Sequence, residues 1–129
     1  MVDANVLISG SVWPRFPYLV LQHAISHDFQ LILSPYIIQE AHRHMSRKFS
    51  SDLWRFAEML GFCEYEQVPN PSKEEVKRYP HLICDPNDIP VALSAINVQV
   101  DYLVTRDKDF TDPDASIHEY LNIILPGTF

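Results

Sequence analysis

The stretch Ile83–Phe110, ICDPNDIPVALSAINVQVDYLVTRDKDF, joins an apolar helical pattern to an apolar strand pattern. From Asp88 to Asn97 apolar residues recur near helical spacing, and Pro90 falls in the first turn, where its missing N–H costs least. The next run, Asp101–Thr105, is rich in β-formers and too apolar to be half exposed, which is typical of a buried parallel strand. The stretch therefore predicts a helix followed by a buried strand of an α/β fold.

Aspartates flank both predicted elements. Asp88 stands where the helix begins and Asp107 where the strand ends, with Asp85 and Asp109 close by in the sequence. Ligands of parallel α/β sheets collect at the carboxyl ends of strands and at helix N-termini, so Asp88 and Asp107 are expected on one edge. This concentration of carboxylates suggests a cation site. For Asp88 taken alone, the alternative is that it only caps the helix.

The composition is that of one globular domain, which we expect to span residues 1–129. The 129 residues are 47% hydrophobic and 21% charged, enough for one core and too few for a second domain. Neither a membrane-spanning run nor a signal-peptide pattern is apparent, so we expect a cytoplasmic protein without a membrane contact. The formal charge of −7 argues against nucleic-acid binding through a broad basic surface, but it allows a local basic rim.

The first segment, Met1–Ser9, places a carboxylate among apolar residues. Val2 and the run Val6–Ile8 are strand-like or core-like, and Asp3 interrupts them. A buried charge is costly unless it is paired or binds a metal. The alternative is a surface position at the end of a strand, and both interpretations stay open.

Helices and strands alternate along the rest of the chain. Turn signals occupy residues 10–16. Helices are predicted at 17–27, from 35, at 51–60 with Gly61 as terminator, and at 72–79. Strands are predicted at 30–33, 62–68 and 123–125. Ser34-Pro35 is a strong helix start. The inward-facing positions are expected to be Ile37, Ala41 and Met45 in one helix, and Leu53, Phe56, Ala57 and Leu60 in the next. The alternation predicts a three-layer α/β sandwich with a mostly parallel central sheet flanked by helices.

The helix opened by Ser34 also carries Glu40, which lies off its apolar stripe on the side shared with Tyr36. The alternative for Glu40 is a solvated acid paired with His44 or Arg43.

Together these segments resemble the PIN-domain family of metal-dependent ribonucleases, which includes the VapC-type toxins of toxin–antitoxin pairs. The resemblance covers nearly the whole chain, from Val2 to about Pro126. The motifs that carry it are Asp-Ala-Asn-Val-Leu-Ile-Ser at 3–9, the glutamate in the helix opened by Ser34-Pro35, the helix after Asp88, and Tyr-Leu-Val-Thr-Arg-Asp-Lys-Asp-Phe at 102–110. Each motif alone is weak, and their order and spacing together are fairly specific.

The resemblance implies a set of site residues. Metal ligands and catalytic acids would be Asp3, Glu40, Asp88 and Asp107, with Asp109 as a further metal ligand and Asn5 and Thr105 as supporting polar residues. Asp85 belongs to an Asp-Pro turn that is common in one branch of the family, and we interpret it as structural. Clustered carboxylates repel one another, and all-oxygen ligands favour Mg²⁺ or Mn²⁺ over zinc.

The predicted reaction is metal-assisted hydrolysis of an RNA phosphodiester. RNA would be the substrate, a small antitoxin a possible partner, and a homodimer the expected assembly. Trp54 or Trp13 would serve that interface, unless both tryptophans belong to the core. Candidates for a phosphate-contacting rim are Arg15, Arg43, Arg47, Lys48, Arg106 and Lys108, although surface charges often serve solubility alone.

Two alternative functions stay open. The first is a catalytically silent PIN-like module that binds RNA or a protein. The second is a phosphatase-like enzyme, which would usually have a second aspartate two residues after the first, where this chain has Asn5.

Overall fold

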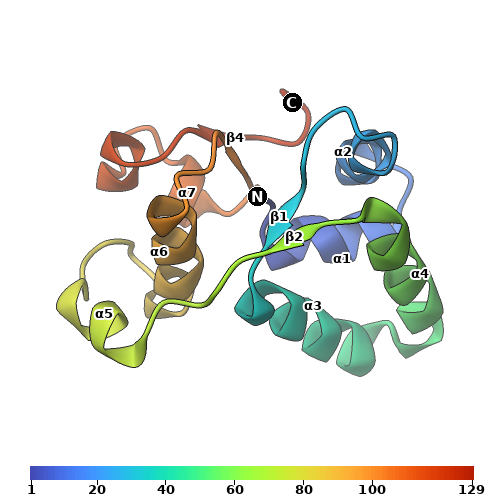
Figure 1. Ribbon diagram of the computed structural model, residues 1–129, viewed down its shortest axis with the longest axis horizontal. Helices are drawn as coiled ribbons and strands as arrows, with labels where there is room; N and C mark the ends of the chain where they lie inside the picture. Colours follow the sequence, from blue (N-terminus) through green and yellow to red (C-terminus); the bar gives the residue numbers. More distant parts are fainter.

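Short parallel strands and many helices make up the chain, which the computed structural model describes from Met1 to Phe129 (Figure 1). The elements, with η for 3-10 helices, are α1 (Ala4–Val12), α2 (Phe16–Ile25), β1 (Ile32–Leu33), α3 (Pro35–Lys48), η1 (Ser50–Asp52), α4 (Leu53–Cys63), β2 (Glu66–Gln67), α5 (Lys73–Arg78), η2 (Pro86–Asp88), α6 (Ile89–Asn97), β3 (Leu103–Val104), α7 (Lys108–Thr111), η3 (Ser116–Glu119) and β4 (Ile123–Ile124). In Figure 1 the strands lie between α1 to α4 on one side and α5 and α6 on the other. No helix has both the length and the apolar character needed to cross a membrane.

The strands are parallel, as predicted, but they form two separate pairs. β1 pairs with β2, and β3 pairs with β4 in a register that places Leu103 opposite Ile123. The N-terminal segment adds one parallel bridge, from Val2 to Val104, on the other side of β3. Each strand has only two residues, so the mostly parallel central sheet expected from the sequence is present as short fragments. The fold is mixed α/β with more helix than strand.

The segment after Asp3 is a helix, so the strand-like interpretation of Val6–Ile8 is wrong. Asp3 caps α1 by accepting a hydrogen bond on Oδ1 from the Val6 N–H at 3.1 Å. Most residues of α1 are buried, and α1 packs against α2, α3 and α4. A helix that is apolar nearly all round lacks the one-sided pattern that identifies helices in a sequence, and Val and Ile favour strands when considered locally.

Two helices begin where the sequence predicts. Ser34 caps α3 by accepting from the Ile37 N–H at 3.4 Å, and Ser72 caps α5 by accepting from the Glu75 N–H at 3.1 Å. The predicted apolar stripe of α3 is fully buried: Ile37, Ala41 and Met45. Strong capping residues followed by an amphipathic pattern therefore located these helices correctly.

Helix α4 continues past Gly61, which the sequence predicts as its terminator. It ends at Cys63, and the next residue, Glu64, has the left-handed conformation that often ends a helix, with φ 47°. Ala57 is exposed, contrary to the prediction that it faces inward. The buried residues of α4 are Phe56, Met59 and Cys63. Because α4 extends to Cys63, the strand predicted at 62–68 is reduced to β2.

Trp13 and Trp54 lie at the surface. They are 42% and 61% exposed, so the alternative that both belong to the core is wrong. Exposed aromatic side chains of this size are frequent at protein interfaces. A homodimer through these side chains stays a prediction.

The stretch that decides the fold forms α6 and β3, as predicted. A turn of 3-10 helix, η2, precedes α6, and both residues of β3 are buried. Most of α6 is buried as well: Ile89, Val91, Ala92, Leu93, Ser94 and Ala95. The buried helix and strand thus fix the positions of the turns that carry the aspartates.

Gly10 lies in α1, not in the predicted turn, and it allows α1 and α2 to approach closely. A Cβ at Gly10 would lie 3.1 Å from the Pro17 carbonyl oxygen and would clash with the fully buried Leu21 side chain. We expect Gly10→Ala to lower the free energy of unfolding by about 1–3 kcal/mol, because overpacking displaces buried groups.

Gly61→Ala is the matched control for this substitution. A Cβ there meets nothing within 4 Å, and alanine restricts the unfolded chain, so the free energy of unfolding should rise by about 0.4–1 kcal/mol. Urea denaturation measures both changes. A Gly10→Ala variant as stable as the parent would contradict the close contact between α1 and α2.

Candidate metal centre

Six acidic residues on four segments carry the candidate site. Asp3 precedes α1, Glu40 lies on α3, Asp85 and Asp88 lie at the turn η2, and Asp107 and Asp109 lie at the start of α7. The carboxylate of Asp107 raises the pKa of both Asp3 and Asp88. Asp107 therefore lies close enough to repel both carboxylates, and it connects Asp3 with the acids of the turn η2.

Asp3 is a buried carboxylate, so the alternative of a surface position is wrong. Its Oδ1 accepts from the Val6 N–H, and its Oδ2 accepts from the Thr105 hydroxyl. The pKa of Asp3 is raised to about 6, chiefly by burial; the two hydrogen bonds oppose this shift, and the carboxylates of Asp107 and Glu40 add to it. Asp3 thus keeps its charge at neutral pH only against a substantial desolvation penalty.

The Thr105 hydroxyl connects Asp3 to the turn after β3. Thr105 is fully buried, and its Oγ1 donates to Asp3 and accepts from the Asp107 N–H at 3.0 Å. A hydroxyl has one donor and two acceptor positions, so both bonds can form at once. Asp107 in turn accepts on Oδ1 from the Asp109 N–H at 2.9 Å. This series of bonds fixes the acids after β3 relative to the start of α1.

Asp88 has no structural partner in its own turn. Asp85 caps that turn by accepting on Oδ1 from the Asn87 N–H at 2.9 Å, whereas the Asp88 side chain caps nothing. The alternative that Asp88 is only a helix cap is therefore wrong. Its Oδ2 is buried and has no hydrogen-bond partner. Buried polar atoms in folded proteins are nearly always paired, so this oxygen lacks a partner that the site is built to receive.

The pKa of Asp88 is raised to about 8. Burial is the largest cause, followed by the carboxylates of Asp107, Asp85 and Asp109. A carboxyl group with such a pKa holds a proton at neutral pH unless a positive charge takes its place. The electrostatics of this turn therefore favour a bound cation.

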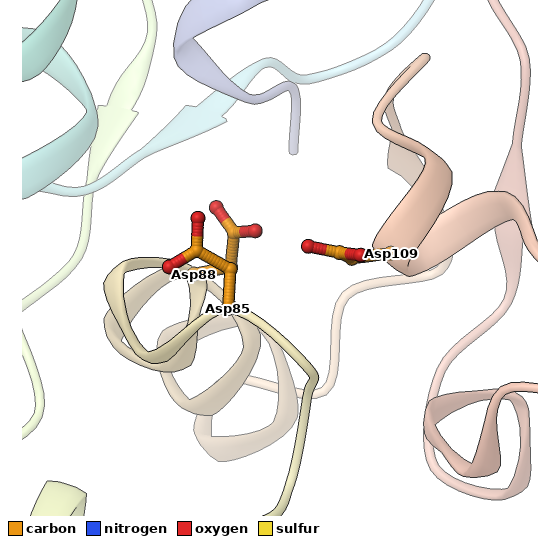
Figure 2. Close-up of side chains that lie close together, drawn as sticks. All are labelled: Asp85, Asp88 and Asp109. Carbon is orange, nitrogen blue, oxygen red and sulfur yellow. The ribbon is translucent and has the colours of Figure 1, made fainter.

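Three of the acids place their oxygens close enough to share one cation. One carboxylate oxygen from each of Asp85, Asp88 and Asp109 lies within 4.8 Å of the others. In Figure 2, Asp85 and Asp88 lie side by side and Asp109 faces them from the start of α7. The sequence placed Asp85 among the aspartates that suggest a cation site but assigned it a structural role and left it out of the metal ligands. Its cap confirms the structural role, and its oxygen also lies beside that of Asp88.

Glu40 and Asn5, which the sequence also predicts at the site, are not part of this group of three. Glu40 is half-buried, and its charge raises the pKa of Asp3, so its carboxylate acts on the same site. It forms no ion pair with His44 or Arg43, contrary to the alternative interpretation. Asn5 is exposed, and its side chain forms no hydrogen bond with the acids, so a supporting contact from Asn5 is not present.

The donor set fits a hard divalent cation. Every side chain in the group offers carboxylate oxygens, which suit Mg²⁺ or Mn²⁺ better than zinc. A positive charge here would give the Oδ2 of Asp88 a partner. It would also offset the burial and the repulsion that raise the pKa values of Asp3 and Asp88. The arrangement can therefore hold a metal ion at the ends of β3 and η2.

Comparison with known proteins identifies the family. The PIN-domain family model matches residues 1–109, a range that includes all six acids. The chain belongs to the PIN-domain family. Members of this family are generally nucleases, which agrees with an acidic cluster suited to a metal ion. A search of curated proteins found no significant match.

The raised pKa of Asp3 predicts an unusual pH dependence of stability in the metal-free PIN domain. In mildly acidic solution the folded state holds a proton on Asp3 that the unfolded chain has already released, so stability falls as the pH rises through about 6. From Asp3 alone we expect the free energy of unfolding in EDTA to be about 1–2 kcal/mol lower at about pH 8 than at about pH 5. Asp88 acts in the same direction.

The Asp3→Asn variant keeps a good helix cap but cannot titrate at this position, so it should lose this share of the pH dependence. Urea denaturation of both proteins across this pH range measures the difference. Identical pH profiles for parent and variant would contradict a strained carboxylate at Asp3.

Proposed function

We propose that this PIN domain is a metal-dependent ribonuclease that hydrolyses phosphodiester bonds of RNA. The observation that carries the proposal is the buried, unpaired Oδ2 of Asp88, surrounded by the carboxylates of Asp85, Asp107 and Asp109. The oxygens of a purely structural acid would be paired or exposed, whereas the Oδ2 of the half-buried Asp88 is buried and unpaired. Family membership supports a nuclease, and the resemblance noted from the sequence favours RNA as substrate.

The metal ligands in this proposal are Asp3, Glu40, Asp88, Asp107 and Asp109, as inferred from the sequence, with Asp85 added because its oxygen lies beside those of Asp88 and Asp109. When bound, Mg²⁺ or Mn²⁺ would supply Lewis-acid activation of water and neutralise charge on the phosphate. Thr105 is a positioning residue, since it donates to Asp3 and accepts from the Asp107 backbone.

Asp88→Asn tests this assignment because it removes the ligand charge with hardly any change in volume. We expect RNA cleavage in Mn²⁺ or Mg²⁺ to fall by about 100-fold or more, and EDTA to abolish cleavage by the parent. Asp114→Asn is the matched control, because Asp114 is exposed and lies outside the cluster. Cleavage of a labelled single-stranded RNA measures the effect.

Metal binding can be measured in the same proteins without a substrate. A cation that binds only the folded parent stabilises it by about 2.7 kcal/mol at 100 times its dissociation constant. Mn²⁺ should therefore raise the Tm of the parent and of Asp114→Asn, and have much less effect on Asp88→Asn and Asp85→Asn. Equal Mn²⁺ responses in all four proteins would exclude a shared site.

The second candidate function is a catalytically silent PIN-like module that binds RNA or a protein. The close approach of oxygens from three acids disfavours this function, since carboxylates repel the phosphates of RNA and a binding surface gains nothing from them. A clean preparation that binds RNA and takes up Mn²⁺ but cuts none of several RNA substrates would favour it.

We further propose that the nuclease is the toxin of a toxin–antitoxin pair. Support comes from an apolar cleft of about 710 Å³ between α1, α2 and α4, whose lining includes the exposed aromatic residues Trp54 and Phe62. A small antitoxin could bury such a surface while placing an arginine among the acids, since a guanidinium can replace a cation bidentately.

Growth of cells that express the chain tests the toxin role. Expression of the parent should slow growth, Asp88→Asn should not, and co-expression of a cognate antitoxin should restore growth and yield a stable complex on purification. Normal growth despite an active purified ribonuclease would contradict the toxin role and leave the ribonuclease proposal intact.

A further inference from the structure

A second, smaller cleft is lined by basic and aromatic side chains and includes Arg106, the residue that precedes Asp107. Its volume is about 270 Å³, and its lining is Ser9, Trp13, Arg15, Pro17 and Arg106. Ser9 belongs to α1, and Arg106 lies in the chain between Thr105 and Asp107. Thr105 and Asp107 are both hydrogen-bonded within the acidic site, so the backbone of Arg106 is held next to the acids while its side chain lines the cleft.

The two arginines of this cleft have no acidic partners. Neither Arg15 nor Arg106 forms an ion pair, although the protein carries a formal charge of −7. The hydrogen bond of Arg106 goes to a neutral group, from Nη2 to the Ser9 Oγ at 3.4 Å. Two exposed arginines from distant parts of the sequence therefore line one cleft whose lining contains no carboxylate. Guanidinium groups in this state suit a phosphate, to which they can bind bidentately.

Trp13 gives the cleft an aromatic wall. Its side chain is 42% exposed, and its ring packs edge-on against Phe49, with centroids 5.4 Å apart and an interplanar angle of 86°. The contact fixes the orientation of the indole, and the exposed part of Trp13 remains accessible. Aromatic side chains beside basic groups are the usual platform for unstacked bases of single-stranded nucleic acid.

We propose that this cleft binds single-stranded RNA next to the bond that is cut, with Arg15, Arg106 and the Ser9 hydroxyl on a flanking phosphate and Trp13 stacked on the adjoining base. The inference rests on the proposed ribonuclease function and adds a substrate subsite to it. It assigns two of the six basic rim candidates to one site, because only Arg15 and Arg106 line this cleft. The subsite favours an unpaired strand, since a base in a duplex cannot stack on a side chain.

Binding of a fluorescently labelled single-stranded RNA in EDTA tests the arginines without any cleavage. Arg15→Gln and Arg106→Gln should each raise Kd by on the order of tenfold and lower the slope of log K against log salt by about 0.7. Arg78→Gln is the matched control, since it removes the same charge from the exposed end of α5, far from α2 in Figure 1. All three arginines are exposed, so thermal melting should confirm unchanged folding.

Fluorescence tests the aromatic wall separately. The chain has two tryptophans, so Trp54→Phe leaves Trp13 as the only one, and stacking of a base should quench its emission when RNA is added. In the Trp54→Phe background, Arg106→Gln should shift this quenching to higher RNA concentration by the same factor as Kd.

The outcomes separate the subsite from the proposed function. Equal losses of binding for all three arginine variants, or RNA binding without quenching of Trp13, would overturn the subsite even if the protein cleaves RNA. Selective losses together with quenching would support the subsite, and a failure to cleave RNA with Mn²⁺ would then count against the ribonuclease proposal alone.

Discussion

The hydrogen bond from the Thr105 hydroxyl to the Asp3 carboxylate is the contact on which the rest of the structure depends. It joins two buried residues that lie 102 positions apart in the sequence. Asp3 also caps α1, the helix against which α2, α3 and α4 pack, while Thr105 ends β3 and accepts from the Asp107 backbone. One buried polar contact therefore orients the central helix, the central strand and the acids together. The parallel bridge from Val2 to Val104 reinforces the same junction.

The acids that would bind a metal also lower the stability of the metal-free fold. Burial and mutual repulsion raise the pKa of Asp3 to about 6 and that of Asp88 to about 8, so each carboxylate is less favourable when ionised here than in the unfolded chain. The surrounding core tolerates this because its apolar residues form one continuous cluster that includes α1, α6 and β3. A cation would remove the repulsion, so the same groups that weaken the metal-free fold would favour metal binding. Strained sites of this kind are typical of functional positions.

The surface around the acids is divided by chemical type. Carboxylates converge at the ends of η2 and β3, two arginines and Trp13 line a small cleft that includes the neighbour of Asp107, and a larger apolar cleft lies between α1, α2 and α4. Trp13 borders both clefts. A strongly acidic protein can still offer positive charge to a phosphate locally, because the guanidinium groups of Arg15 and Arg106 are free of ion pairs. The net charge alone therefore describes this surface poorly.

The sequence by itself determined the elements that depend on local signals. Ser34-Pro35 and the stripe Ile37, Ala41 and Met45 predicted α3, and the pattern after Asp88 predicted α6 and then β3. The order of the acids along the chain was enough to indicate the family, because each acid belongs to a short motif that can be recognised locally. Local interactions of capping and periodicity control these features, and they are visible in a few consecutive residues.

Only the tertiary structure decided which groups meet. Val6–Ile8 became helical because burial on all sides of α1 outweighs the strand preference of its residues, and α4 continued past Gly61 because its buried face extends to Cys63. The partnership of Asp85 with Asp88 and Asp109, and that of Arg15 with Arg106, depends on how η2, α7, α1 and the end of β3 pack. Such contacts join residues far apart in the chain, and their energies depend on burial and distance, which no local pattern encodes.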